Sequence, residues 1–141
     1  DLLQTKDMFQ HITISDYLFT KCLLFAKVNL PEEEFRLYQK LFDIMHQQII
    51  FPDVVIYLHA SVNKLQKNIK KRNRTYEQNI SDEYLFNIQE TYTGYIKQHN
   101  IKTIFVDASN ADFLDNEKHL KVVLDALESD LDDGQHYFTL P

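Results

Sequence analysis

The chain has 141 residues, of which 44% are hydrophobic, and this is enough apolar content for one globular domain with its own core. The formal net charge is −6 at pH 7, which argues against a nucleic-acid-binding surface, because neutralising phosphates requires a net positive face. Cys22 is the only cysteine, so no intramolecular disulfide is possible, and no apolar run reaches the roughly 18 residues of a membrane span. We therefore expect a cytoplasmic protein without membrane contact.

The first third of the chain is expected to hold a short strand and two helices. The chain does not begin with an initiator methionine, and residues 1–8 resemble the end of a helix that begins upstream. The sequence is therefore expected to be a piece of a longer protein. Residues 10–15 are β-prone, and residues 16–29 show helical apolar spacing. Pro31 then begins a second helix with three glutamates behind it, which is the favoured place for proline and for acids.

Strands and helices alternate along the rest of the chain. They are expected as a strand over residues 54–58, helices over 61–69 and 82–98, a strand over 102–108 and a helix over 117–127. Apolar strands that alternate with long helices indicate an α/β fold, a three-layer parallel sheet with helices on each face. Only three strands are recognisable, so further elements are expected upstream. Residues 129–141 are expected to be a polar tail that docks elsewhere or is disordered.

A basic segment follows the helix that is expected to end near Ile69. Four cations lie within five residues, namely Lys70, Lys71, Arg72 and Arg74. Guanidinium groups can form paired hydrogen bonds with phosphate oxygens, and a flexible loop can carry them over a bound nucleotide. Cations also gather at helix C-termini because they interact favourably with the helix dipole. For the two arginines the functional interpretation is favoured, because they extend past the expected last turn and a carboxylate follows.

Two further segments follow expected strands. In parallel α/β folds ligands bind at the carboxyl ends of strands, and Asp16 lies there, where it could hold a hydrated magnesium ion or orient a substrate. Ser15 and Asp16 are equally suited to cap the helix that follows. Residues 107–113, which include Asp112 and Phe113, follow a later strand in the same way, and they could line the purine pocket of ATP or simply form a turn.

Other kinds of site lack support in the sequence. The glycines are Gly94, inside an expected helix, and Gly134, so a glycine-rich phosphate loop would have to lie upstream. The six histidines show no metal-ligand spacing, and no metal site is predicted. No set of residues suggests a nucleophilic triad.

Several blocks, taken together and in order, resemble the deoxynucleoside kinases, which share the architecture of the P-loop nucleotide monophosphate kinases. They are residues 25–27, 52–58, 70–77, 80–85, the helix ending at Tyr95 and Ile96, and residues 106–109. The resemblance runs from about residue 11 to residue 127. It is greatest to a form found in Bacteroidetes-like bacteria, in which the kinase can be fused behind a pterin pyrophosphokinase domain of folate synthesis.

The resemblance implies that residues 1–128 are the C-terminal part of a kinase domain without its P-loop. The lid would span about residues 70–80. Arg72 and Arg74, with Lys71 beside them, would contact the ATP phosphates. Glu77 would hold the sugar 3′-hydroxyl, with Tyr76 in the same substrate site.

The chain departs from the family pattern at one place. The family usually carries an acid-Arg-Ser motif after its third strand, and this chain has Ser15, Asp16 and Tyr17 there, so an acid stands in place of the arginine. Asp16 is therefore either used differently from that arginine or marks a weakened enzyme. The family's general base and base-recognising glutamine would precede this fragment.

The function expected from these observations is transfer of the ATP γ-phosphoryl group, with Mg²⁺, to the 5′-hydroxyl of a deoxynucleoside. The alternatives are a nucleoside monophosphate kinase and a non-catalytic kinase-like domain in a folate-pathway fusion protein. The expected partners are a small-molecule deoxynucleoside and a second copy of the chain in a homodimer, without nucleic acid or membrane.

Overall fold

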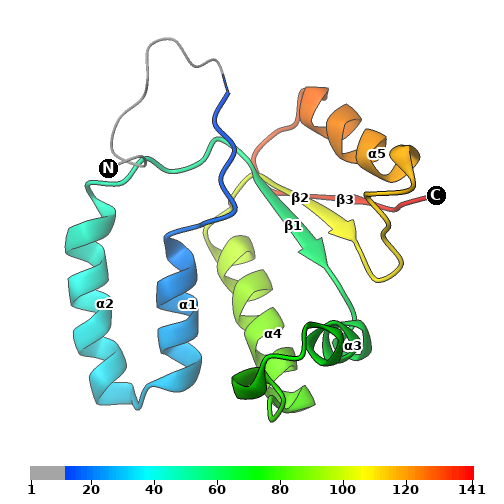
Figure 1. The fold of residues 1–141 in the computed structure, drawn as a ribbon. Coiled ribbons are helices and arrows are strands. Elements are labelled where there is room, and N and C mark those ends of the chain that lie inside the picture. The colour runs from blue at the N-terminus through cyan, green and yellow to red at the C-terminus, as the bar shows by residue number, and fades with distance from the viewer. Residues whose placement is uncertain (1–11) are drawn as a thin grey trace. The chain divides into compact units, whose positions relative to one another are not determined.

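The computed structural model describes residues 12–141 (Figure 1). The chain divides into two compact units, Asp1–Pro52 and Asp53–Pro141. No helix of the described residues is both long and apolar enough to cross a membrane.

Two helices pack against each other in the described part of the first unit, residues 12–52. They are α1, Thr20–Asn29, and α2, Glu32–His46. Pro31 precedes α2 with φ at −57°, and glutamates fill the first turn, where their charge interacts favourably with the helix dipole. The buried Phe42 stacks on Phe19 with ring centroids 5.0 Å apart and on His46 at 5.2 Å.

The strand expected over residues 10–15 is not found in the described part of that segment. Residues 12–15 form no strand, Ile12 and Ile14 are largely exposed, and residues 10 and 11 lie outside the described residues. Alternating apolar residues make a strand only where a neighbour accepts and donates its backbone hydrogen bonds. The helix also begins at Thr20 rather than at residue 16, with Phe19 and not Ser15 or Asp16 at its N-cap.

The second unit is built around a parallel sheet with the strand order β1-β2-β3. The strands are β1, Val55–His59, β2, Thr103–Asp107, and β3, Gln135–Phe138. The central strand β2 is buried up to its last residue, Asp107, because it has a neighbour on each side and helices above and below.

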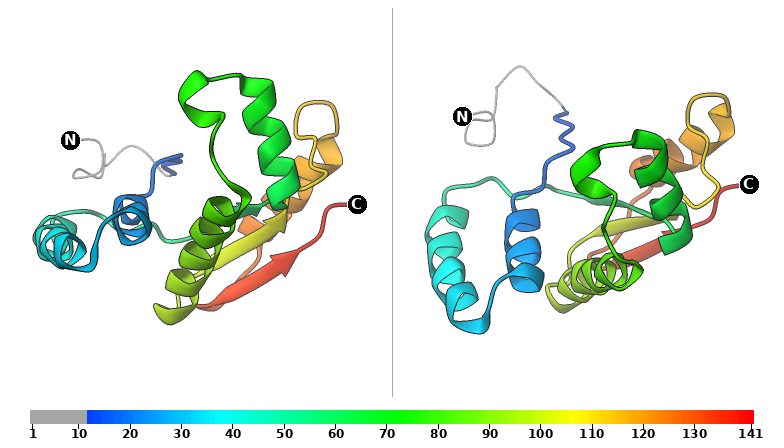
Figure 2. Two further views of the ribbon diagram at one scale, coloured as in Figure 1. Left: turned by 90° about the horizontal axis from the view of Figure 1, so that it is seen from below. Right: turned by 60° about the horizontal axis from the view of Figure 1, so that its bottom comes forward.

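Helices cover both faces of this sheet (Figure 2). The helices are α3, Val62–Arg72, α4, Asp82–Gln98, and α5, Glu117–Glu128. Ile104 and Val106 of β2 pack against Val123 and Ala126 of α5. Phe105, which points to the other face, packs with Ile96 of α4 and with Ile101. The expected three-layer α/β arrangement is therefore confirmed for this unit.

The expectation of a docking or disordered tail was wrong for Gln135–Phe138, which form β3. The backbone of Thr103 donates to the carbonyl of Gly134 at 2.8 Å, and Gly134 has φ at +117°, a conformation that favours glycine. Phe138 then packs against the core on the α5 side. The sequence did not indicate this strand, because polar residues precede Gly134 and no long apolar run follows. The stability of β3 comes from its pairing with β2.

The outer edge of β1 is open. Among the described residues, no strand pairs with that edge of β1. Ile56 and Leu58, which point to the α5 face of the sheet, are 39% and 51% exposed although they are aliphatic. An unpaired strand edge beside exposed aliphatic side chains is suited to pairing with a further strand.

Candidate functional site

The candidate site begins at the end of α3. Ser61 caps the start of this helix by accepting a hydrogen bond from the Lys64 backbone at 3.3 Å. Asn73 ends it, with φ at 54° in the left-handed region that asparagine tolerates. The expected end at Ile69 was wrong, so Arg72 lies in the last turn of α3 and only Arg74 lies beyond it.

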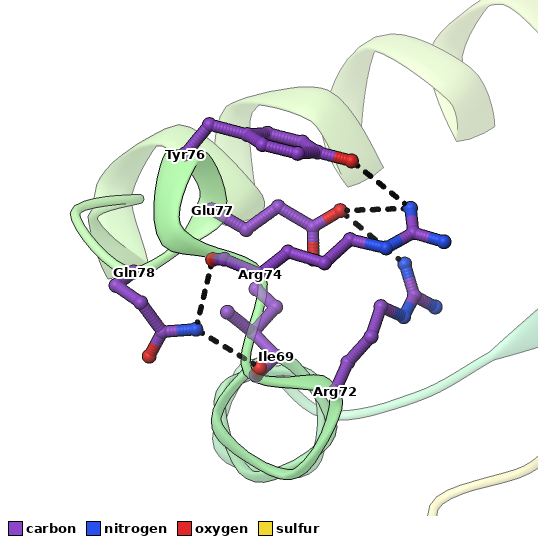
Figure 3. A network of polar contacts seen from close by, with 6 residues as sticks. All are labelled: Ile69, Arg72, Arg74, Tyr76, Glu77 and Gln78. Carbon is purple, nitrogen blue, oxygen red and sulfur yellow. Dashed lines mark hydrogen bonds and ion pairs between the residues drawn. The ribbon is translucent and has the colours of Figure 1, made fainter.

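Residues at the end of α3 and just after it form a compact polar cluster (Figure 3). We call Arg72, Arg74, Tyr76 and Glu77 the lid cluster. One carboxylate oxygen of Glu77, Oε1, lies 3.5 Å from Nη1 of Arg72 and 3.4 Å from Nη1 of Arg74. Nη1 of Arg74 also donates to the Tyr76 hydroxyl at 3.2 Å. The structure thus brings together four of the residues that the sequence analysis assigned to the nucleotide and sugar sites.

The two arginines are held loosely. Contacts of 3.4 and 3.5 Å are long for charge-assisted hydrogen bonds, and the arginine side chains are 53% and 57% exposed. Most of their N–H groups thus remain available to an incoming anion. The hydrogen bond to Tyr76 and the nearby carboxylate of Glu77 raise the pKa of the Arg74 guanidinium.

Glu77 differs from the arginines because it is mostly buried. Its side chain is only 13% exposed, and its second carboxylate oxygen, Oε2, is buried without a hydrogen-bond partner. Leaving a buried acceptor unpaired costs free energy, and a charged acceptor costs more than a neutral one. Oε2 is therefore an unpaired acceptor, which a hydroxyl or amine could reach only if the lid cluster opened to admit it.

Two glutamines stabilise the segment that carries the lid cluster. The amide of Gln78 donates to the carbonyls of Ile69 at 3.3 Å and Arg74 at 3.1 Å. The amide of Gln66 donates to the carbonyl of Ile80 and to the side chain of the first residue of α4, both at 2.8 Å. Sequence reasoning missed both glutamines, because an amide on a helix or in a loop is ordinarily a surface residue.

The segment was expected to be a flexible loop, but it contains a short 3₁₀ helix, η1, Thr75–Glu77. Its hydrogen bonds with Gln66 and with the Ile69 carbonyl connect it to α3, and Gln66 also bonds to Asp82 at the start of α4. A segment tied in this way is suited to moving as one piece rather than residue by residue.

The carboxyl ends of β1 and β2 lie next to the start of α3. The backbone of Ser61 donates to the hydroxyl of Ser109 at 3.1 Å, which joins the segments that follow the two strands. Asp107, the last residue of β2, accepts from the backbone of Ser109 at 2.9 Å, and this hydrogen bond lowers the pKa of its carboxyl group. Asp107 begins the segment, residues 107–113, that the sequence analysis considered for the purine pocket because of its position at a strand end.

Asp112 and Phe113 lie in the connection between β2 and α5. The Asp112 carboxylate accepts from the backbone of Asp115 at 3.0 Å and of Leu114 at 3.1 Å. These two hydrogen bonds, the first more than the second, lower the pKa of Asp112. Phe113 is half-buried and packs against the core on the α5 side.

The remaining predicted residues stand apart from these contacts. Lys71 is exposed on α3, and Asp16 is exposed in the first unit, in a bend where Ser15 bonds to the backbone of Tyr17. Within residues 12–141 no three histidine, cysteine, aspartate or glutamate side chains gather as a metal site.

Comparisons with known proteins agree with the resemblance seen in the sequence. A deoxyguanosine kinase of Bacillus subtilis (strain 168) is 29% identical over 109 residues, which cover 74% of this chain and 53% of that protein. A deoxyadenosine kinase of Lactobacillus acidophilus is 28% identical over 134 residues, 84% of this chain and 62% of that protein. A deoxyadenosine kinase of Dictyostelium discoideum is 28% identical over 114 residues, 81% of this chain and 46% of that protein.

The chain thus spans about half the length of these curated relatives. The sequence model of one family, described as deoxynucleoside kinase, matches residues 4–131. Because that match covers most of the 141 residues, the chain belongs to the deoxynucleoside kinase family.

Proposed function

We propose that this chain is the C-terminal part of an enzyme that transfers the γ-phosphoryl group of ATP to the 5′-hydroxyl of a deoxynucleoside. The observation that carries the proposal is the lid cluster, in which two loosely held arginines flank a buried carboxylate with a free acceptor oxygen. The three relatives described above are named as kinases of deoxyguanosine or deoxyadenosine, and this supports a deoxynucleoside as the substrate.

The lid arginines are assigned to the phosphates of ATP. Phosphoryl transfer needs positioning and stabilisation of negative charge more than covalent chemistry by the protein. Arg72 and Arg74 can exchange their long contacts with Glu77 for paired hydrogen bonds to phosphate oxygens at little cost. Lys71, on the same helix end, adds positive charge beside them.

Glu77 is assigned to the sugar, with Tyr76 beside it. A 3′-hydroxyl can donate to the unpaired Oε2, which would remove the cost of the buried acceptor. Asp112 and Phe113 are assigned to the adenine of ATP. We expect Mg²⁺ to accompany ATP. Within residues 12–141 no three side chains form a group that could hold this ion, and the roles assigned to Glu77, Tyr76, Asp112 and Phe113 do not depend on it.

The rest of the catalytic machinery is proposed to lie upstream. A glycine-rich phosphate loop, the general base and the base-recognising residue are all expected there. The open edge of β1, with Ile56 and Leu58 exposed beside it, supports pairing with a strand from that part of the protein. A fused pterin pyrophosphokinase domain and a homodimer remain part of the same proposal.

One experiment distinguishes the proposed function from the two alternatives, a nucleoside monophosphate kinase and a non-catalytic kinase-like domain. The full-length protein would be assayed for ATP-dependent phosphorylation of the four deoxynucleosides and of their monophosphates. Phosphorylation of deoxynucleosides is the expected result. Activity on monophosphates alone would indicate a nucleoside monophosphate kinase. If neither deoxynucleosides nor their monophosphates are phosphorylated, the non-catalytic domain is favoured. The presence of Asp16 in place of an arginine is the reason for considering that function.

A further inference from the structure

His119 is a buried polar residue near the start of α5. It is 6% exposed, and its ring contacts two distant parts of the second unit. Nδ1 accepts a hydrogen bond from the backbone N–H of Asp112 at 3.0 Å. Nε2 lies 3.2 Å from the main-chain oxygen of Pro141. One imidazole thus connects the β2–α5 segment with the chain that follows β3.

The direction of these hydrogen bonds determines which ring nitrogen carries the proton. A backbone N–H can only donate, so Nδ1 must be unprotonated, and in the neutral ring the hydrogen is on Nε2. The side-chain nitrogen of Asn116 is 3.0 Å from Nε2, but it is a donor too. The main-chain oxygen of Pro141 is therefore the acceptor for the Nε2 hydrogen.

The contact at Nδ1 orders the segment that the proposed function assigns to adenine. Asp112 donates its N–H to His119 while its carboxylate accepts from the next backbone groups, so both of its polar ends are engaged. Phe113 lies edge-on to the same imidazole, with centroids 6.4 Å apart and planes at 79°. The histidine therefore contacts both of the residues that the proposed function assigns to the base.

We propose that His119 is a positioning residue that holds Asp112 and Phe113 in the conformation that receives the adenine of ATP. The inference rests on the proposed function, because it assumes that this segment contacts ATP. Nδ1 is the atom that matters for this role, since it accepts the hydrogen bond from Asp112, whereas Nε2 lies near Asn116 and the main-chain oxygen of Pro141. His119 should then set the affinity for ATP without affecting turnover or the affinity for the deoxynucleoside.

Two conservative substitutions separate the ring nitrogens. Asn in His119→Asn can place its oxygen close to the position of Nδ1 and keep the acceptor for Asp112. Gln in His119→Gln reaches the position of Nε2 and loses that acceptor. His119→Ala removes both. His136→Ala is the matched control, because His136 also bonds to a backbone carbonyl, that of Asp132, but belongs to β3.

The experiment measures the ATP dissociation constant of the full-length protein by calorimetry, alongside kcat and the two KM values. Loss of one buried hydrogen bond should weaken ATP binding about five- to tenfold in His119→Ala and His119→Gln. His119→Asn should stay within about twofold of the parent, as should His136→Ala. The deoxynucleoside KM and kcat should change little in all variants that fold.

Hydrogen exchange of backbone amides keeps the test independent of activity. The Asp112 amide should lose protection in the Ala and Gln variants and keep it in the Asn variant. Equal ATP affinity in the Asn and Gln variants, or equal loss of affinity for both substrates, would overturn the positioning role. A parent that binds ATP without phosphorylating any deoxynucleoside refutes only the proposed function, and a parent that does not bind ATP refutes both.

Discussion

Glu77→Gln tests whether the buried carboxylate of the lid cluster binds the sugar. The substitution keeps the size of the side chain and an acceptor oxygen, but it removes the charge. The Glu77 side chain is 13% exposed and its Oε2 has no partner, so a hydroxyl that enters the site meets an acceptor shielded from water. The parent enzyme should therefore prefer deoxynucleosides to 2′,3′-dideoxynucleosides, which lack the donor.

The expected magnitude follows from the difference between two kinds of hydrogen bond. Bonds to charged groups contribute about 1.5–3 kcal/mol and neutral bonds about 0.5–1.5 kcal/mol. Glu77→Gln should thus reduce the preference for the 3′-hydroxyl by about 1–2 kcal/mol, or about 5- to 30-fold in the ratio of kcat/KM values. No part of this figure comes from the arginine contacts, which are long and half-exposed.

The assay compares kcat/KM for a deoxynucleoside and for its 2′,3′-dideoxy analogue in the full-length parent and in the variant. Glu83→Gln is the matched control, because Glu83 is an exposed acid in the first turn of α4 and its loss removes the same charge. An unchanged ratio in Glu77→Gln would refute the reasoning. If Glu77 served only to hold Arg72 and Arg74, kcat would fall for both substrates together.

Three other predictions concern the lid arginines, the extent of the chain and Asp112. Arg72→Ala and Arg74→Ala should each lower kcat by up to about 10³-fold, and far more than they weaken deoxynucleoside binding, because they act on transferring phosphates; steady-state kinetics that show parental turnover would contradict the lid assignment. The 141-residue chain alone should show no ATP-dependent phosphorylation, since no glycine-rich loop lies within it, and measurable product would mean that the nucleotide site is elsewhere. The lowered pKa of Asp112 means that its carboxylate stabilises the fold above the ordinary value of about 3.9 and loses this effect as the pH falls through the lowered value. Urea unfolding should show the full-length parent more stable than Asp112→Asn above about pH 4, with the difference disappearing in stronger acid; a difference that does not depend on pH would contradict the role of the charge.

The sequence by itself determined the alternation of strands and helices in the second unit. Apolar periodicity marked β1, β2 and the helices within a few residues, because these signals depend on which side chains a local segment can bury. Local chemistry also marked helix starts, such as the serine before α3 and the serine before α4, both of which cap as expected from their type. The members of the lid cluster also lie within six residues of one another, so the sequence alone places them in one segment.

Only the tertiary structure decided where strands pair. Residues 12–15 carry a strand pattern but remain irregular, whereas Gln135–Phe138 follow a polar stretch and still form β3. A strand forms when its backbone N–H and C=O groups can form hydrogen bonds with a segment that is distant in the chain. A single sequence does not reveal which distant segment is available for that pairing. The end of α3 at Arg72 was missed for a more local reason, because left-handed asparagine can end a helix without any change in apolar spacing.

Burial of polar side chains was also decided by the tertiary structure. Glu77 and His119 are buried because α3, α4 and the β2–α5 segment fold around them, and nothing in their sequence neighbours distinguishes them from exposed residues of the same type. The amides of Gln66 and Gln78 acquire their partners in the same way. The sequence could indicate where phosphate-binding charges lie. It could not indicate that Oε2 of Glu77 stays unpaired or that the His119 ring supports the β2–α5 segment, because both depend on tertiary contacts.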